Sequence, residues 1–545
     1  MMATSLRLTV TAALASAVLL WLSSPAVGAG WLAWIAIVPV AAAVIAAPGT
    51  RTARVAVPLA VAVYLELLLV PAFPFGVAEG QWGDPVVPVL VADSPLIVIA
   101  LVAVPLAGAL LYLARFGEPW GASRLSGAPA TLALVAVPAL AWTALDFARA
   151  NLDPGALWGP LFLSQAGQPA GALAGLAGPW LVTIAIVAVN YGLAVAIVRR
   201  RIAPALGPVL GVVALVLAAA AVERGAADRP AVRVAAIQPG YDTAERERPE
   251  LRYFRRGTFD LAALDLIADL GELTRDARAS GAELVVWPEA SMYVDPRSES
   301  EAGDALRDLA LEVGVPIVVP FFRPSPLSEG EVLAVVPGPG GAALTESTPK
   351  HRPHWFIGER RAAGEIGPID AGIVEVGALL GTDTQDARNG AALTDAGAEL
   401  LASVTHDWRQ SAVPAAAYGR LSARAAGAPV VRADWRFGSA IYAADGTVLA
   451  DAGPDRDRTA IVADVAPAAS PSPYTRLGDW VGWLAVAAVA LAALGSIGST
   501  IRLRRRLSRE GARGAGGRAP RRGSPPRPPA RERPPAAAAP KPPPP

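Results

Sequence analysis

Two residues in the second half of the sequence have the type and the setting of catalytic groups. Glu289 follows the apolar run at 285–287, which predicts a strand, and layered α/β domains usually build their sites at strand ends. For Glu289 alone, a solvated acid after a strand is an equally good interpretation. Lys350 is the only lysine before residue 541 in a chain with 48 basic residues. Because lysine provides a compact ammonium whose pKa can be tuned, its use in an arginine-rich chain favours a functional role.

The composition excludes several kinds of site. The chain has 545 residues and no cysteine, so it forms no disulfide, no thiolate metal site and no cysteine nucleophile. The three histidines, His351, His354 and His406, have no carboxylate spacing that matches a known metal site. We therefore expect neither a metal nor another cofactor.

The chain is too apolar for an ordinary soluble protein of this size, with 53% hydrophobic and 17% charged residues. A spanning helix needs about 20 mostly apolar residues, and eight stretches approach this length. They lie at about 6–22, 31–47, 55–73, 95–114, 130–147, 179–198, 204–222 and 479–498. The first could alternatively be a signal peptide, because Ala-Val-Gly-Ala follows it.

The arginine positions predict an orientation for these spans. Every second connection is basic, as at Arg199, Arg200 and Arg201, so the positive-inside rule places both termini in the cytoplasm. We expect a membrane domain over 1–222, an extracytoplasmic domain over 223–478 and a last transmembrane helix over 479–500. Residues 501–545 are basic and rich in proline, which predicts a disordered cytoplasmic tail. A position near anionic lipid explains this tail better than nucleic-acid binding.

Between residues 230 and 470, β-branched runs alternate with helical stretches, which predicts a layered α/β domain. Strands are expected at 232–238, 283–287, 316–321, 332–336, 399–405, 430–433, 439–443 and 461–465. Helices are expected at about 257–280, 301–313, 386–396 and 412–427. These elements must bring Glu289 and Lys350 together, but the pattern alone does not name the fold.

The order of the motifs resembles the nitrilase, or carbon–nitrogen hydrolase, superfamily and in particular its membrane branch, the apolipoprotein N-acyltransferases. The motifs are Val-Val-Trp-Pro-Glu-Ala at 285–290, Pro-Lys-His at 349–351, Phe-Ile-Gly-Glu at 356–359, the run at 400–408 and the run at 420–433. The segment from Trp142 to Asn190 also resembles that family's sequence before its soluble domain. The resemblance implies a nitrilase-like α-β-β-α sandwich outside a bundle of about eight helices in the bacterial cytoplasmic membrane.

The resemblance also implies a Glu-Lys-Cys triad, whose thiolate takes an acyl chain from a phospholipid and passes it to the N-terminal amine of a lipoprotein. Here Glu289 matches the general base, Lys350 the lysine that stabilises the oxyanion, and Glu359 a supporting acid. The nucleophile position falls on Gly381, and Asp383 matches the acid two residues later. The family pattern at 381–383 is Cys-Tyr-Glu, so the thiol and the tyrosine are both missing here, and the acid is an aspartate.

Three interpretations of function remain open. The favoured one is a degenerate homologue that binds phospholipid and lipoprotein without thioester chemistry and supports an active paralogue or another cell-envelope enzyme. The second is an active acyltransferase or amidase with a non-cysteine nucleophile, for which Thr382 and Thr384 are candidates. A hydroxyl is a far weaker nucleophile than a thiol near neutral pH, which counts against it. The third is a non-catalytic envelope scaffold whose tail recruits a cytoplasmic partner.

Overall fold

The computed structural model describes residues 2–46, 56, 60–61, 63–64, 127–151, 159–224, 229–240, 259–298, 300–324, 328–353, 359–407, 409–453, 457–492 and 494. Residues 1–489 form one compact unit and residues 490–545 a second.

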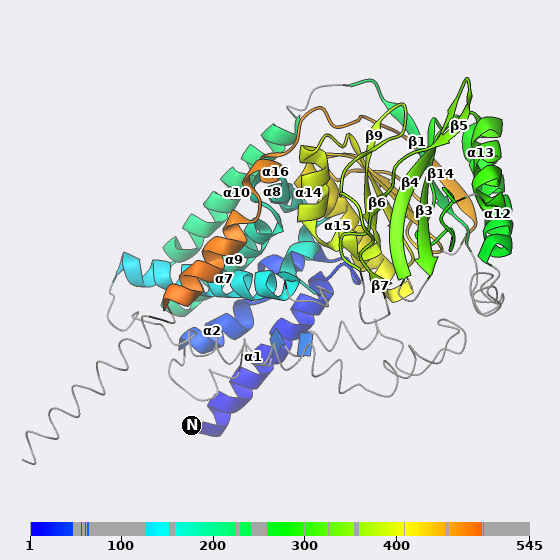
Figure 1. Cartoon of the computed structure of the whole chain (residues 1–545). Helices are drawn as coiled ribbons and strands as arrows, with labels where there is room; N and C mark the ends of the chain where they lie inside the picture. The colour runs from blue at the N-terminus through cyan, green and yellow to red at the C-terminus, as the bar shows by residue number, and fades with distance from the viewer. Residues whose placement is uncertain are drawn as a thin grey trace, which may run out of the picture. The chain divides into compact units, whose positions relative to one another are not determined.

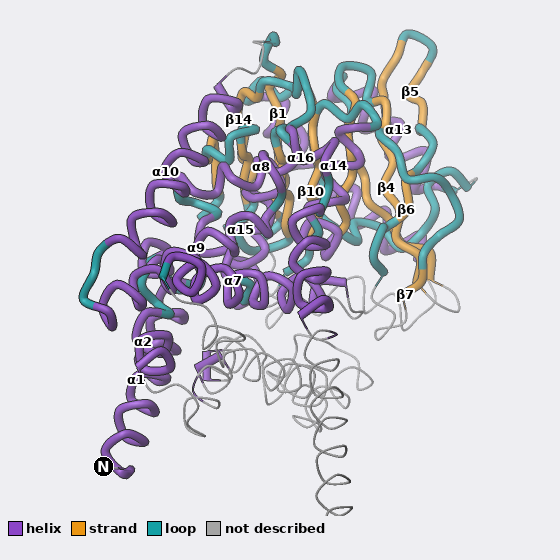
Figure 2. The backbone as a smooth tube through the Cα atoms, turned by 90° about the vertical axis from the view of Figure 1, so that its left-hand side faces the viewer, coloured by secondary structure: helices purple, strands orange, loops and turns teal. Residues whose placement is uncertain are grey.

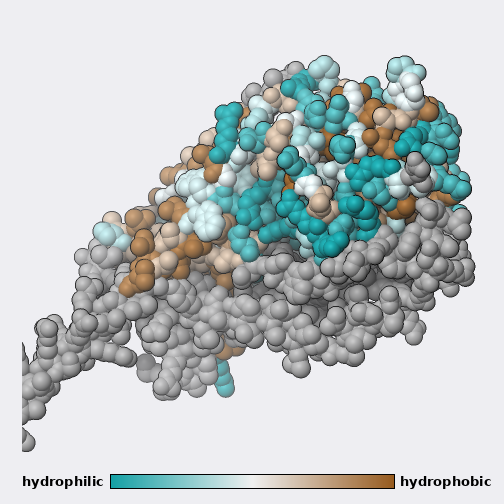
Figure 3. All heavy atoms as spheres, in the orientation of Figure 1, coloured by the Kyte–Doolittle hydropathy of each residue, from teal (hydrophilic) through white to brown (hydrophobic). Residues whose placement is uncertain are grey.

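The first half of the described chain is helical. Its elements are α1 (Met2–Ser23), η1 (Gly30–Trp34), α2 (Val38–Ala46), α7 (Ala128–Asn151), η3 (Leu161–Gln165), η4 (Pro169–Ala172), α8 (Leu173–Ala177), α9 (Pro179–Arg199) and α10 (Ala203–Arg224). Apolar side chains of α10 such as Leu210, Val213 and Leu217 are at least half exposed. On the face seen in Figure 3, hydrophobic residues gather over the long helices and hydrophilic residues over the strands.

The prediction of eight spans is only partly matched. Among the described residues, α7, α9 and α10 are the helices long and apolar enough to cross a membrane. The first predicted span is the helix α1, and the last coincides in part with a shorter apolar helix over Trp480–Ala492. The predicted span at 55–73 lies outside the described residues except for five positions, and that at 95–114 lies wholly outside them.

The second predicted span, 31–47, is corrected by the structure, because it is interrupted between η1 and α2. At the interruption Asn190 of α9 accepts hydrogen bonds from the backbone N–H groups of Ile37 (2.8 Å) and Val38 (3.2 Å). The same side chain donates to the carbonyl of Ala33 at 2.8 Å. Backbone groups freed by a helix break are costly away from water unless the protein satisfies them. Asn190 thus replaces part of the hydrogen bonding that a continuous helix would have supplied.

The second half of the unit contains two sheets. One has the order β14–β1–β2–β3–β4–β5, with β6 and β7 also paired to β4, and the other has the order β13–β12–β11–β10–β9–β8. The first sheet consists of β1 (Val232–Gln238), β2 (Leu284–Val286), β3 (Ile317–Pro324), β4 (Ser328–Gly338), β5 (Gly341–Leu344), β6 (Thr348–Pro349), β7 (Glu359–Arg360) and β14 (Thr459–Val465). The second consists of β8 (Ile369–Asp370), β9 (Glu375–Leu380), β10 (Leu400–Thr405), β11 (Val430–Asp434), β12 (Ala440–Tyr442) and β13 (Val448–Asp451). Strands β1, β2 and β3 run parallel to one another, as do β9, β10 and β11.

Side chains alternate along the strands between two buried layers. Val234 of β1 packs against the second sheet, whereas Ala235 joins a core with α12 (Phe259–Ala279) and α13 (Glu301–Val313). In β9, Leu380 faces the first sheet and Leu379 faces α14 (Ala387–Asp395) and α15 (Arg409–Ala426). The order helix, sheet, sheet, helix is visible in Figure 1, and Figure 2 shows the same strands in orange among purple helices. The layers therefore agree with the expected α-β-β-α sandwich.

Each of the eight predicted strands and four predicted helices of this part overlaps an observed element. Six strands were not among the predicted ones: β5, β6, β7, β8, β9 and β13. β6, β7 and β8 have two residues each, too few to give a periodic pattern. β9 reads Glu-Val-Gly-Ala-Leu-Leu, in which glycine, alanine and leucine do not favour a strand.

Candidate active site

Strand ends bring the predicted site residues together. Glu289 lies three residues after β2, and Gly381 is the first residue after β9 on the facing sheet. Lys350 directly follows β6, and Glu359 begins β7, and both of these strands pair with β4. Four residues that are up to 92 positions apart in sequence (381 minus 289) thus belong to one site.

Lys350 lies between the two glutamates. Its Nζ is 3.0 Å from Oε1 of Glu289 and 3.0 Å from Oε2 of Glu359. Only 1% of Lys350 is exposed, and its Nζ lies 5.6 Å from the centroid of the Phe322 ring. The backbone N–H of Lys350 donates to the carbonyl of Gly330 at 2.9 Å, which fixes the start of the loop to β4.

Burial, and the presence of one ammonium beside two carboxylates, determine the pKa values of Glu289 and Lys350. Burial lowers the pKa of Lys350, but Glu289 and Glu359 outweigh burial and raise it, so the lysine stays charged. Burial, together with the charge of Glu359, raises the pKa of Glu289 to about 7, although Lys350 lowers it. A carboxyl group with such a pKa can accept and release a proton near neutral pH, as a general base requires.

Gly381 faces the carboxylate of Glu289 with its bare backbone. A Cβ on residue 381 would lie 2.8 Å from Oε2 and 2.9 Å from Oε1 of Glu289, closer than real Cβ contacts. The φ angle of Gly381 is +52°, a conformation that other residues adopt at a cost. Both the space and the backbone therefore suit glycine at the position where the resemblance expects a nucleophile.

The residue after Glu289 is also in an uncommon conformation. Ala290 has a φ of 57°, and among the described residues the only other non-glycine residue with a positive φ is Arg200. The indole N–H of Trp435, which follows β11, donates to the carbonyl of Glu289. Backbone strain of this kind persists where the surroundings enforce it, and it concentrates at functional sites.

Asp383 is buried and organises the backbone around the site. Its carboxylate accepts hydrogen bonds from the backbone N–H groups of His351 (2.9 Å), Arg352 (2.7 Å) and Leu380 (3.2 Å). Burial raises the pKa of Asp383 above its ordinary value, although the charges of His351 and Lys350 and the hydrogen bonds from His351 and Arg352 lower it. Asp383 thus ties the loop after Lys350 to the end of β9.

The hydroxyls of Thr382 and Thr384 form hydrogen bonds with residues other than Glu289. The hydroxyl of Thr384 lies 2.8 Å from that of Ser403 on β10. The hydroxyl of Thr382 donates to the carbonyl of Arg352 at 3.3 Å. These hydrogen bonds direct neither hydroxyl to Glu289.

A second buried charge cluster at the ends of β10 and β11 was not among the predicted site residues. Arg432 is fully buried and contacts Asp407 (2.6 Å) and Asp434 (3.3 Å). Asp407 also contributes to the raised pKa of Glu289. The signal that could have found this cluster is an arginine inside the apolar run of β11.

Two of the three histidines lie in the described part of the chain. His351 lies in the loop after Lys350, the ring of His406 is 5.7 Å from that of Trp435, and His354 lies outside the described residues. In the described part of the chain, no group of three or more histidine, aspartate or glutamate residues could hold a metal ion.

Comparisons with known proteins give structural neighbours only. No protein-family model and no curated protein matches the chain. The similar solved structures include a carbon–nitrogen hydrolase from Helicobacter pylori G27, which is 14% identical, with 43% of this chain and 89% of that chain covered and a TM-score of 0.34. Another is Nit3 of Saccharomyces cerevisiae, a member of branch 10 of the nitrilase superfamily, also 14% identical, with 44% and 92% covered and a TM-score of 0.35.

Proposed function

We propose that this chain is an apolipoprotein N-acyltransferase-like membrane protein that binds phospholipid and lipoprotein but has lost acyl transfer. The observation that carries the proposal is the bare backbone of Gly381 against the carboxylate of Glu289. In the chemistry that the resemblance implies, Glu289 removes a proton from a thiol, and the thiolate attacks the ester of a phospholipid. Here the base and the lysine are retained, but the chain has no thiol for them to activate.

The hydrogen bonds of the neighbouring threonines argue against a substitute nucleophile. Attack by a hydroxyl requires a base within hydrogen-bond reach of it. Thr384 is paired with Ser403, and Thr382 with the carbonyl of Arg352. We therefore favour a degenerate protein that supports an active paralogue or another cell-envelope enzyme.

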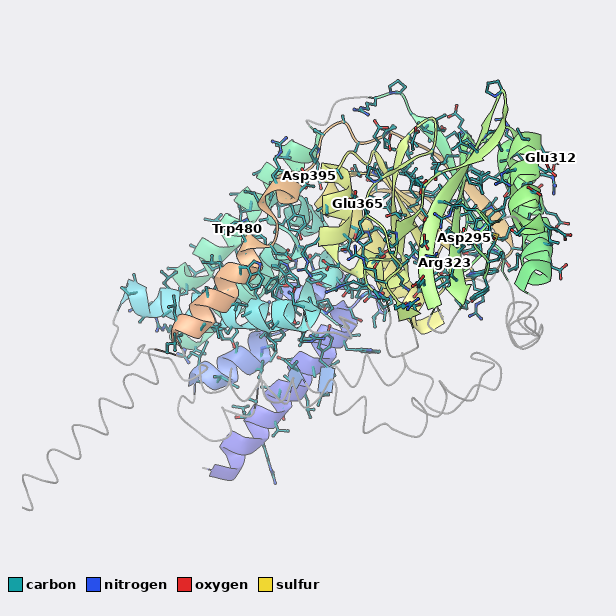
Figure 4. All side chains as sticks on the ribbon, viewed as in Figure 1. Asp295, Glu312, Arg323, Glu365, Asp395 and Trp480 are labelled. Atoms are coloured by element: carbon teal, nitrogen blue, oxygen red, sulfur yellow. The ribbon has the colours of Figure 1, made fainter. Side chains whose placement is uncertain are left out.

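The proposal requires a membrane location, and features of the helical part support one. The apolar exposed side chains of α10 suit contact with lipid, and the exposed residues Arg199, Arg200 and Arg201 between α9 and α10 suit a cytoplasmic connection. Trp480, labelled in Figure 4, begins the apolar helix over Trp480–Ala492 and is 47% exposed, as expected of an interfacial tryptophan. We propose a multi-pass protein of the bacterial cytoplasmic membrane, with cytoplasmic termini and the two-sheet domain outside.

The test is a search for a covalent acyl adduct. Full-length protein in detergent is incubated with an alkyne-labelled phospholipid, and the adduct is sought by mass spectrometry. We expect no adduct on the wild-type chain and a thioester on the Gly381→Cys variant, because that variant restores the thiol to the retained base and lysine. Since a Cβ at residue 381 displaces the Glu289 carboxylate, we expect slow labelling of this variant.

Two outcomes would contradict the proposal. An adduct on the wild-type protein that maps to Thr382 or Thr384, and disappears in the corresponding alanine variant, identifies an active enzyme. If the Gly381→Cys variant forms no thioester and native mass spectrometry detects no bound phospholipid, the proposed phospholipid binding is wrong.

A further inference from the structure

We infer that Arg352 is a positioning residue that fixes the site to the C-terminal end of helix α7. Arg352 lies two residues after Lys350, and its backbone and its guanidinium make contacts in different elements. The inference does not depend on the proposed function, because it concerns which part of the molecule holds the site in place.

The backbone of Arg352 is hydrogen-bonded to residues next to Gly381. Its N–H donates to Oδ1 of Asp383 at 2.7 Å, and its carbonyl accepts a hydrogen bond from the hydroxyl of Thr382 at 3.3 Å. Both partners belong to η6 (Gly381–Gln385), the turn that begins at the bare backbone facing Glu289. A displacement of Arg352 would therefore displace both Lys350 and Gly381.

The guanidinium of Arg352 reaches the C-terminal end of helix α7. Nη2 donates to the carbonyl of Ala150 at 2.9 Å, in the last turn of α7, and Nη1 lies 3.4 Å from Asp386. The last four carbonyls of a helix lack partners within the helix, and the end carries partial negative charge. An arginine at this position satisfies one of these carbonyls and complements the charge.

A second arginine reaches the same helix end. Arg388, in the first turn of α14, donates to Oδ1 of Asn151 at 2.9 Å and pairs with Asp386 at 2.7 Å. Arg388 also lies 3.5 Å from Asp479, which accepts hydrogen bonds from Trp180 of α9. These links show that α7 meets the two-sheet domain through a connected set of charges.

The packing around the contacts between Arg352, Asp386 and the end of α7 is incomplete. A cavity of about 20 Å³, enough for about one water molecule, lies beside Arg352 and Asp386. Its apolar walls come from residues such as Phe162, Trp180 and Tyr418. Because apolar contact is incomplete beside Arg352, we assign the local connection to its hydrogen bonds and ion pair.

The test compares amide hydrogen exchange in three variants of the full-length protein. In Arg352→Gln we expect the amides of His351, Arg352 and Leu380 to exchange at least about tenfold faster, while the amides at 234–237 in β1 stay unchanged. Arg352→Lys keeps a cation at the helix end and should restore most of the protection.

Arg233→Gln is the matched control. Arg233 also contacts one carbonyl, that of Ser280 at 3.0 Å, and one carboxylate, that of Asp464 at 3.1 Å, and it lies on β1. This variant should leave exchange at the site as in the wild type. Unchanged exchange in Arg352→Gln would overturn the inference, and so would an equal acceleration at 234–237, which would indicate general destabilisation.

Discussion

Two buried charge clusters at neighbouring strand ends have the same composition, one cation with two carboxylates, but different surroundings. In the cluster around Arg432, the carboxylate of Asp434 accepts hydrogen bonds from the backbone N–H groups of Asp407, Arg436 and Phe437, at 2.8 to 2.9 Å. Arg432 in turn donates to the carbonyls of Phe437 and Gly438. This cluster is part of the backbone framework.

In the cluster around Lys350, no backbone N–H group of the described residues donates to the carboxylate of Glu289. Within the described residues, Lys350 is the only hydrogen-bond donor to the carboxylate of Glu289, whose other face meets the backbone of Gly381. Burial with a single shared donor raises the affinity of Glu289 for a proton. The environment of a charge cluster, rather than its composition, therefore separates a structural cluster from a cluster that can exchange protons.

The largest expected effect is that of Arg432→Met, which leaves the buried carboxylate of Asp434 and the partly buried carboxylate of Asp407 without their cation. Breaking a buried ion pair in this way costs about 3–5 kcal/mol. Urea denaturation of the detergent-purified protein measures the change, with Arg233→Met on the surface of β1 as the control. A loss below about 1 kcal/mol would contradict the structural role assigned to this cluster.

A smaller effect is expected for Lys350→Met, because Glu289 can take up a proton when the ammonium is removed. We expect a loss of about 1–3 kcal/mol at pH 7 and a smaller one at pH 5, where the carboxyls are more readily protonated. The same denaturation experiment at both pH values measures it. If Lys350→Met and Arg432→Met lose equal stability at both pH values, the distinction between the clusters fails.

The last expected effect is a change in how stability depends on pH, and it is caused by Glu289. Its pKa is about 7 in the folded chain against 4.5 as the ordinary value, so between these pH values the folded state binds the extra proton. The stabilisation is therefore complete below pH 4.5 and is lost as the pH rises through 7, by at most about 1.4 kcal/mol per pH unit.

Glu289→Gln cannot titrate and should flatten this part of the stability profile. Asp304→Asn, at an exposed position on α13, removes the same charge and should leave the profile as in the wild type. A profile of equal slope in Glu289→Gln and the wild type would show that another group titrates in this range.

The structure brings the residues of the predicted site close together, whereas it matches the predicted spans only in part. Glu289 and Lys350 were recognisable because one follows an apolar strand and the other is a rare residue type, and both signals are local. The interruption between η1 and α2 depends on Asn190, which is 153 residues away from Ile37. Sequence periodicity in a run of apolar residues carries no information about such a partner.

Some features of the site could not be predicted from the sequence, because they depend on contacts between distant segments. The resemblance located the nucleophile position at Gly381, but the closeness of Glu289 to a Cβ at this position follows only from the packing of two facing sheets. The role of Asp383 was predicted as an adjacent acid, whereas its bonds to His351 and Arg352 arise from a loop 31 to 32 residues earlier.

The burial of Lys350 has a consequence for chemical labelling of the molecule. The sequence has two lysines, and the other, Lys541, lies outside the described residues. A protonated amine that is 1% exposed and ion-paired is shielded from acylating reagents. Modification of Lys350 would therefore require a local opening of the structure around it, and its rate would record how often that opening exposes the amine to solvent.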